Sequence, residues 1–421
     1  MSYFMINHEK ASSLAKKYGT PLYVYDEVKL VERIKEYKNN FKSNKFDTKV
    51  IYASKAFSCV YLYKLLQKHG FGIDVVSLGE MITAIKAKVE PSDIYFHGNN
   101  KSNKEILIGL NYGEITFVVD NYGELQAIDE ISKKINKKCK ILLRMNVNVE
   151  ADTHKYDVTA HLDSKFGMLS DSEEFELCKK LLNQNTHLRF DGYHCHIGSQ
   201  LFTLDTHYRA IDKMLDLIKE PVILNIGGGF GANYTKEDKA LTAKEVSQSL
   251  INYVEEQLIK RDKKIKSLMI EPGRSIVADS GYTLYTIGNQ KITPNKHYYF
   301  VDGGMSDNIR PALYQAKYEC DLVDRMDEEK TVKATIAGKC CESGDILIEE
   351  CMLPPYKRND ILIVYSTGAY GYSMASNYNK LEIPGVVFVD EFSSKEVIKR
   401  QEIASMIERE IDLWLKVQSL H

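Results

Sequence analysis

Between residues 49 and 271, short β-branched runs alternate with longer segments of helical apolar spacing, and this alternation limits the folds open to the chain. It is typical of parallel strands joined by crossover helices. Eight such units predict a closed (β/α)8 barrel rather than an open doubly wound sheet. The predicted strands are residues 49–53, 72–77, 93–97, 115–120, 140–147, 189–197, 222–226 and 267–271.

After about residue 275 the helical rhythm stops, and β-type runs at 282–287, 297–302, 332–337 and 360–365 dominate. A further run at 20–26 precedes the barrel strands, and we expect it to pair with the C-terminal sheet. The predicted organisation is an N-terminal strand segment (1–30), a barrel (31–274) and a C-terminal β-sandwich or β-barrel domain with a terminal helix (275–421).

The composition favours a small-molecule partner. The formal net charge is −2, with 27% charged and 44% hydrophobic residues, which predicts no binding to nucleic acid or to acidic membranes. We find no signal-like N-terminus and no apolar run approaching the ~20 residues that span a bilayer, so we expect a cytoplasmic protein. The eight cysteines lack zinc spacing, which predicts reduced thiols and no metal site.

The active site of such a barrel lies where the strands end, and the predicted strand ends carry many polar residues. These are Lys55, Asp74 with Glu80 just beyond, His97, Arg144, His194, His196 and Glu271.

The last two predicted strands run into the tight turns Gly227-Gly228-Gly229 and Glu271-Pro272-Gly273-Arg274. Loops at this place are the usual phosphate site of the fold, and glycine lets backbone N–H groups approach an anion. A dinucleotide fingerprint is a poor alternative, because the G-x-G-x-x-G spacing is missing.

Lys55 directly follows an apolar strand, where an amine can form an imine with an aldehyde. Taken alone, it would more often be an ordinary lysine reaching solvent. The two phosphate turns and Glu271 change that balance, because a pyridine ring with a phosphate arm needs all three. The sequence therefore predicts pyridoxal 5′-phosphate, with Glu271 beside the ring nitrogen.

His194 and His196 stand two residues apart on a predicted strand, so a metal pair is geometrically allowed. No carboxylate or cysteine array completes such a site, and we predict no metal. His196 is instead a candidate to stack on the cofactor, and Ser199 to bond its phosphate.

The order of motifs resembles the fold-type III pyridoxal-phosphate decarboxylases over essentially the whole chain, and most closely the diaminopimelate decarboxylase family. The motifs are Tyr52-Ala53-Ser54-Lys55-Ala56, His194-Cys195-His196-Ile197-Gly198-Ser199-Gln200, Gly227-Gly228-Gly229, Glu271-Pro272-Gly273-Arg274, Cys341-Glu342-Ser343-Gly344-Asp345, Gly368-Ala369-Tyr370-Gly371 and Met374-Ala375-Ser376-Asn377-Tyr378-Asn379.

The resemblance implies an alanine racemase-like architecture and a role for each motif. Lys55 would bond the cofactor covalently, His196 would stack on its ring, and Asp74, Glu80 and Tyr370 would lie near it. Ser199 and the two glycine turns would hold the phosphate. The implied cofactor-binding residues of those turns are Gly227, Gly228, Gly229, Glu271, Pro272, Gly273 and Arg274.

The resemblance also implies a substrate, meso-2,6-diaminopimelate, which would lose the carboxylate at its D-centre to give L-lysine and CO2, the last step of lysine biosynthesis. Its contacts would be Arg274, Arg310, Tyr314, Glu342 and Tyr370. Cationic forks and an anion suit a substrate with amino and carboxylate groups at both ends.

Cys341 resembles the family's proton donor, which arrives from the partner subunit of a homodimer. One departure is Lys339-Cys340, where relatives commonly have a proline. Other activities stay open on this scaffold: decarboxylation of ornithine, arginine or carboxynorspermidine, alanine racemisation, or cofactor binding without catalysis. The Cys-Glu-Ser-Gly-Asp string argues against ornithine.

Overall fold

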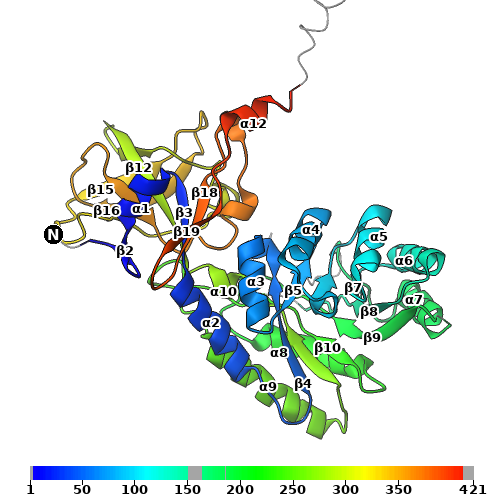
Figure 1. The fold of residues 1–421 in the computed structure, drawn as a ribbon. Helices are drawn as coiled ribbons and strands as arrows, with labels where there is room; N and C mark the ends of the chain where they lie inside the picture. The colour runs from blue at the N-terminus through cyan, green and yellow to red at the C-terminus, as the bar shows by residue number, and fades with distance from the viewer. Residues whose placement is uncertain (1–2, 150–163, 185, 411–421) are drawn as a thin grey trace, which may run out of the picture. The chain divides into compact units, whose positions relative to one another are not determined.

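The computed structural model describes residues 3–149, 164–184 and 186–410, and the chain divides into two compact units (Figure 1). One unit is Lys29–Asp279, here called the barrel unit. The other joins Met1–Val28 to Ser280–His421 and is here called the sheet unit.

Eight parallel strands close the barrel in sequence order, with the last strand pairing to the first. This confirms the predicted (β/α)8 fold. Most of these strands are buried on both faces, as expected for parallel strands under helices. The strands are β4 (Asp47–Ala53), β5 (Gly72–Val75), β6 (Ile94–Phe96), β7 (Thr116–Val119), β8 (Cys139–Arg144), β9 (Leu188–His194), β10 (Ile223–Asn225) and β11 (Ser267–Ile270).

Several barrel helices begin at side-chain caps. Ser102 and Glu105 form a capping box before α5, and Thr242 and Glu245 form another before α9, so each helix start follows from its sequence. The helices are α2 (Glu27–Asn40), α3 (Val60–Lys68), α4 (Leu78–Ala87), α5 (Asn103–Tyr112), α6 (Tyr122–Ile135), α7 (Glu173–Asn183), α8 (Asp205–Leu217), α9 (Ala243–Lys260) and the short α10 (Arg274–Val277).

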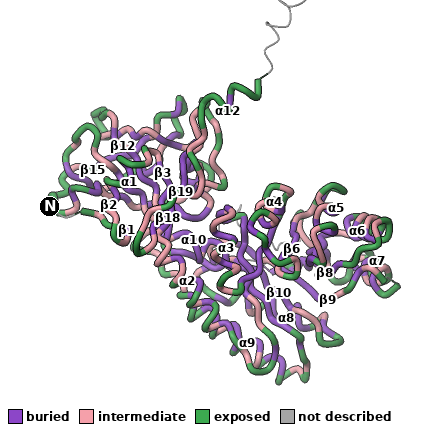
Figure 2. Tube along the Cα trace, in the orientation of Figure 1, coloured by how far each residue is buried: buried purple, intermediate pink, exposed green. Residues whose placement is uncertain are grey.

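A cluster of buried side chains fills the barrel, so the strand ends stand on a packed core rather than a pore. Figure 2 shows the trace of the barrel strands as mostly buried. Its members come from five strands: Ile51, Tyr95, Val118, Leu142 and Met269. This packing fixes where each strand end lies.

The sheet unit is built on a mixed sheet in the order β16-β15-β13-β12-β3-β18-β19, with β14 and β17 attached. The N-terminal strand β3 (Leu22–Asp26) pairs antiparallel with β12 (Gly281–Ile292) and parallel with β18 (Gly385–Val389), which confirms that it joins the C-terminal sheet. The other elements are β1 (Met5–Ile6), β2 (Glu9–Lys10), β13 (His297–Val301), β14 (Cys320–Leu322), β15 (Val332–Ala337), β16 (Ile346–Leu353), β17 (Ile361–Val364), β19 (Ser394–Ile398), α1 (Ala11–Tyr18), α11 (Arg310–Tyr314) and α12 (Ile403–Ile407).

Across the described ranges, we find no helix with the length and apolar character needed to span a bilayer.

Candidate active site

Lys55 lies at the C-terminal end of β4, in a short 3-10 turn of residues Ser54–Ala56. The turn is held because the Ser54 hydroxyl donates to the carbonyl oxygen of Asp74 on the neighbouring strand β5. Ser54 and Ala56 are buried, whereas the Lys55 side chain is exposed. The structure thus presents the amine of Lys55 at the open end of the barrel, on a rigid base.

Two carboxyl groups from the next strand and helix lie near that amine. Burial, only partly offset by His97, raises the pKa of Asp74 to about 6. Burial and the charge of Asp74 raise the pKa of Glu80 to about 7, and its Oε2 accepts from the Val76 N–H at 2.6 Å. Both carboxyl groups interact with the Lys55 charge, so they can hold or release a proton beside it near neutral pH.

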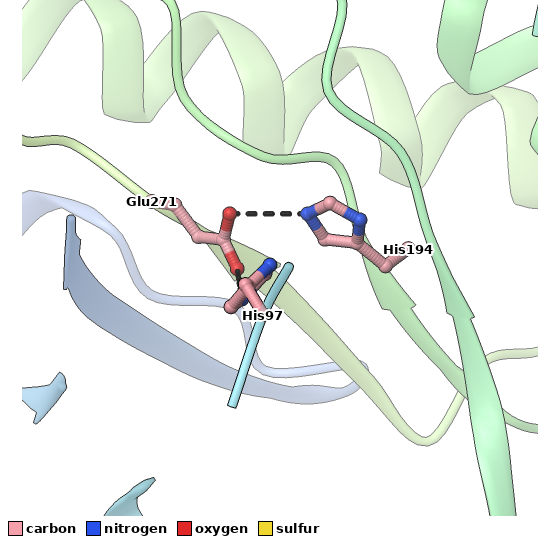
Figure 3. A group of neighbouring side chains, drawn as sticks. All are labelled: His97, His194 and Glu271. Atoms are coloured by element: carbon pink, nitrogen blue, oxygen red, sulfur yellow. Dashed lines mark hydrogen bonds and ion pairs between the residues drawn. The ribbon is translucent and has the colours of Figure 1, made fainter. Parts of the chain in front are cut away.

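Glu271, directly after β11, is buried and bonded through both carboxylate oxygens (Figure 3). His194 Nε2 lies 3.1 Å from its Oε2, Asn225 Nδ2 donates to its Oε1 at 2.7 Å, and His97 Nε2 lies 3.0 Å from Oε1. Burial alone would raise the pKa of Glu271, but His97 and His194 hold it well below its ordinary value. Glu271 is therefore an ionised carboxylate in a dry place.

Sequence reasoning found His97 only as a polar strand end, weighed His194 also as a possible metal partner of His196, and missed Asn225 altogether. The available signal was position, because Asn225 stands two residues before the first glycine of its turn. Its Oδ1 accepts from the Gly227 N–H at 3.0 Å, so one amide supports both Glu271 and the turn.

The two predicted glycine turns lie against each other, since the Glu271 N–H donates to the Gly227 carbonyl at 2.8 Å. A Cβ on Gly228 would lie 2.1 Å from the Glu271 carbonyl oxygen, and one on Gly273 would lie 2.9 Å from Ala53 Cβ. Gly229 has φ +97°, which disfavours any other residue. Glycine is thus required here by close approach and by conformation.

These turns also offer donors. Within the described part of the chain, the backbone N–H groups of Gly229 and Gly273 donate to no protein acceptor. Donors left over beside a glycine turn suit an anionic ligand such as a phosphate. The sequence predicted a phosphate site at these two turns.

Ser199 and Arg274 lie beside the turns and contact each other, with Arg274 Nη2 donating to Ser199 Oγ at 2.7 Å. Arg274 Nη1 donates to the Tyr234 hydroxyl at 2.7 Å. Tyr234 was not singled out from the sequence. A guanidinium carries five N–H donors, and the buried Nε of Arg274 has no hydrogen-bond partner within the described residues, which suits a bound anion.

His196 and His194 have different partners. His196 Nδ1 accepts from the Gly228 N–H at 3.2 Å, while His194 contacts Glu271. Burial and the Lys55 charge hold the pKa of His196 well below its ordinary value. His196 is therefore a neutral flat ring fixed against the first glycine turn, as a stacking role requires.

The remaining predicted site residues belong to the sheet unit. Arg310 opens α11 and donates from Nη1 to the Tyr318 hydroxyl at 2.6 Å, and its guanidinium lies 6.0 Å from the ring centre of Tyr370. Tyr314 is half-buried at the end of the same helix. The structure thus brings Arg310 and Tyr370 together.

Cys341 and Glu342 are exposed on the loop before β16. Asp345 shapes this loop by accepting from the N–H groups of Met305 at 2.6 Å and Cys340 at 2.8 Å, while Asn379 Oδ1 accepts from the Cys341 N–H. At the Lys339-Cys340 departure both backbone N–H groups are used: that of Lys339 donates to the Gly303 carbonyl at 2.9 Å and that of Cys340 to Asp345 at 2.8 Å. A proline at either position would lose one of these bonds.

Taken together, the barrel unit offers an exposed lysine, a neutral imidazole, an ionised buried carboxylate and a pair of anion-binding turns. This set fits an aldehyde cofactor that has a basic ring nitrogen and a phosphate arm.

Comparison with known proteins agrees with this set. Residues 27–278 match the family model described as the pyridoxal binding domain of pyridoxal-dependent decarboxylases. The chain is 46% identical to the diaminopimelate decarboxylase of Bacillus methanolicus, over 92% of each chain. It is 44% identical to that of Bacillus subtilis, over 94% of this chain and 93% of the relative.

Among solved structures, the diaminopimelate decarboxylase of M. jannaschii in co-complex with L-lysine is similar, with a TM-score of 0.90 and 32% identity. The match covers 98% of this chain and 96% of that one.

Proposed function

This chain belongs to the diaminopimelate decarboxylases within the pyridoxal-dependent decarboxylase family, and on that premise we propose that it converts meso-2,6-diaminopimelate to L-lysine and CO2, the last step of lysine biosynthesis. The observation that carries the proposal is the buried, ionised Glu271, which opens the second glycine turn and donates its N–H to the Gly227 carbonyl of the first. The carboxylate suits the ring nitrogen of the cofactor, and the two turns suit its phosphate.

The cofactor is pyridoxal 5′-phosphate, and the barrel unit contains the residues that would hold it. Lys55 would carry it covalently, His196 would lie against the ring and Glu271 would face the ring nitrogen. Ser199, Arg274 and the turns Gly227–229 and 271–273 would hold the phosphate. Bound pyridoxal phosphate supplies an electron-withdrawing ring that accepts the electron pair left when CO2 departs.

The protein's own groups then position the substrate and move protons. Arg274 and Arg310 are the cations suited to the distal carboxylate, and Glu342 is the anion suited to the distal ammonium. Tyr314 and Tyr370 complete this set, and the contact of Tyr370 with Arg310 supports a shared role. A substrate that lacked the distal carboxylate would leave the arginine charge unpaired. This is the physical basis of the proposed preference for diaminopimelate over ornithine.

Cys341 is the group proposed to deliver a proton to the carbon that loses CO2. It is exposed, and its backbone N–H is tied to Asn379, so the thiol is accessible on a fixed loop. Asp74 and Glu80 lie near Lys55 and can exchange a proton with its amine.

We further propose a homodimer in which Cys341 and Glu342 serve the active site of the partner subunit. Support comes from their exposure in one chain and from the family resemblance. A cytoplasmic location is supported by eight free cysteines, which suit a reducing compartment.

The test is CO2 release and lysine formation by the holoenzyme across meso-diaminopimelate, ornithine, arginine and carboxynorspermidine. LL-diaminopimelate, which has no D-centre, is the matched control. We expect turnover of the meso isomer alone. Release of CO2 from ornithine but not from meso-diaminopimelate would overturn the proposal, and racemisation of alanine without decarboxylation would point to the other activity.

A further inference from the structure

His97 contacts Glu271 from a part of the barrel remote from the other partners of that carboxylate. It directly follows β6, whereas His194 ends β9 and Asn225 ends β10, the strand next to β9. His97 Nε2 at 3.0 Å and Asn225 Nδ2 at 2.7 Å lie on one carboxylate oxygen, Oε1. His194 Nε2 lies 3.1 Å from the other, Oε2, and Figure 3 draws both histidine contacts. The carboxylate is thus fixed from two sides.

The two histidines differ in charge. His194 is buried, which lowers its pKa to about 4, and its Nδ1 has no partner in the described ranges, so it is a neutral ring that donates from Nε2. Burial also opposes a charge on His97, but Glu271 and Asp74 outweigh it and raise the pKa of His97. Of the two, His97 is the one suited to carry a positive charge.

The surroundings of His97 are consistent with that charge. The groups that act on it are Glu271 after β11, Asp74 on β5 and Arg144 on β8, two carboxylates against one guanidinium. The ring of His97 packs edge to face against the ring of His194, with 4.8 Å between the ring centroids. A positive charge on His97 would therefore be balanced by the nearby carboxylates.

Glu271 needs such a cation. Burial in a dry site favours a protonated, neutral carboxyl, so without a compensating charge the carboxylate of Glu271 would draw the proton from the ring nitrogen that it faces. Asn225 and neutral His194 orient the carboxylate but add no charge. A positive neighbour adds Coulomb attraction to the hydrogen bonds that already stabilise the carboxylate form.

We propose that His97 is a positioning residue for the cofactor: its positive charge beside Glu271 keeps that carboxylate ionised, so that a proton stays on the pyridine nitrogen of bound pyridoxal phosphate. The inference rests on the proposed function only for the identity of the cofactor. It holds for whichever amino acid is decarboxylated.

The test is the ¹⁵N chemical shift of [¹⁵N-pyridine]pyridoxal phosphate bound to the holoenzyme, which reports protonation of the ring nitrogen without turnover. His97→Gln keeps an N–H donor and removes the charge, so we expect the resonance to move toward the unprotonated position. His194→Gln is the matched control, since it replaces a neutral donor with a neutral donor, and we expect a much smaller change.

An unchanged resonance in His97→Gln, or equal changes in both variants, would overturn the inference. So would a ring nitrogen already unprotonated in the wild type. Should His97→Gln lose its cofactor, His97→Asn carries the same amide on a shorter stem and the same expectation. Failure of the proposed function would show separately, as a wild-type holoenzyme that releases no CO2 from meso-diaminopimelate.

Discussion

Arg274 Nη2 donates to Ser199 Oγ at 2.7 Å, and this bond joins the segment after β9 to the segment after β11. Because β10 lies between those two strands, the bond spans the glycine turn that follows β10. Arg274 and Ser199 therefore bracket the proposed phosphate site.

Ser199→Ala should weaken binding of pyridoxal phosphate about tenfold, because one hydrogen bond to a charged group is lost and Arg274 loses a support. Cofactor titration of the apoenzyme measures it. Ser170→Ala, at an exposed serine of the same unit, is the matched control and should bind normally. Equal affinity of the Ser199 and Ser170 variants for pyridoxal phosphate would show that Ser199 does not bind the phosphate.

Gly228→Ala should lower the free energy of unfolding by about 2 kcal/mol and abolish cofactor binding, because the new Cβ would displace the Glu271 backbone. Denaturant unfolding and visible absorbance measure the two effects. Gly288→Ala is the control, since a Cβ there meets nothing within 4 Å. A stable, cofactor-loaded Gly228→Ala would contradict the close packing of the turns.

Lys55→Ala and Cys341→Ala should separate cofactor attachment from product protonation. The first should lose the cofactor on desalting, whereas the second should retain it and lower kcat about a hundredfold or more. Absorbance spectra and steady-state rates distinguish them. Equal loss of cofactor in both variants would refute the assigned roles.

Mixing those two inactive variants tests the shared site. If Cys341 acts on the partner's cofactor, each mixed dimer regains one intact site, and random exchange returns about a quarter of wild-type activity. Each variant mixed with itself is the control. No recovery after verified subunit exchange would place Lys55 and Cys341 of one chain in the same site.

His207 should make stability depend on pH. Its Nε2 donates to the Gly228 carbonyl at 2.9 Å, its Nδ1 has no partner in the described ranges, and burial lowers its pKa to about 4. The unfolded chain binds the proton more readily, at its ordinary pKa of about 6.5, so stability is complete above that pH and is lost as pH falls toward 4.

The shifted pKa of His207 contributes at most about 3 kcal/mol to the free energy of unfolding. His207→Gln, which retains a donor, should flatten the decline in the free energy of unfolding between pH 6.5 and 4. His187→Gln, at a histidine outside the site, should leave it unchanged. An identical slope in His207→Gln and wild type would exclude the effect.

The barrel was predictable because its strands are short apolar runs separated by amphipathic segments, and that pattern is local. The sheet unit was predicted less completely. Strands β14, β16, β18 and β19 were not assigned. β14 has only three residues, and charged residues interrupt the apolar run in β16 and in β19. The run Gly385–Val389 is nevertheless apolar throughout and is the one that could have been found.

The candidate site shows the same limit. Lys55, Glu271 and the glycine turns follow from position at strand ends. The convergence of His97 and His194 on Glu271 does not, because side-chain direction depends on register. Strands β8 and β9 pair with a register shift between Ile141 and Leu142, and such a bulge changes the face on which later residues such as His194 lie.

The place of β3 between β12 and β18 also constrains the order in which the protein can be made. On the ribosome, residues 22–26 emerge first, yet both neighbouring strands are synthesised only after the whole barrel, and the second is completed at Val389. Until then β3 is a bare apolar edge, open to mispairing. A barrel cut off after Asp279 would retain that edge permanently, so segments on both sides of the barrel sequence are needed to complete a single sheet.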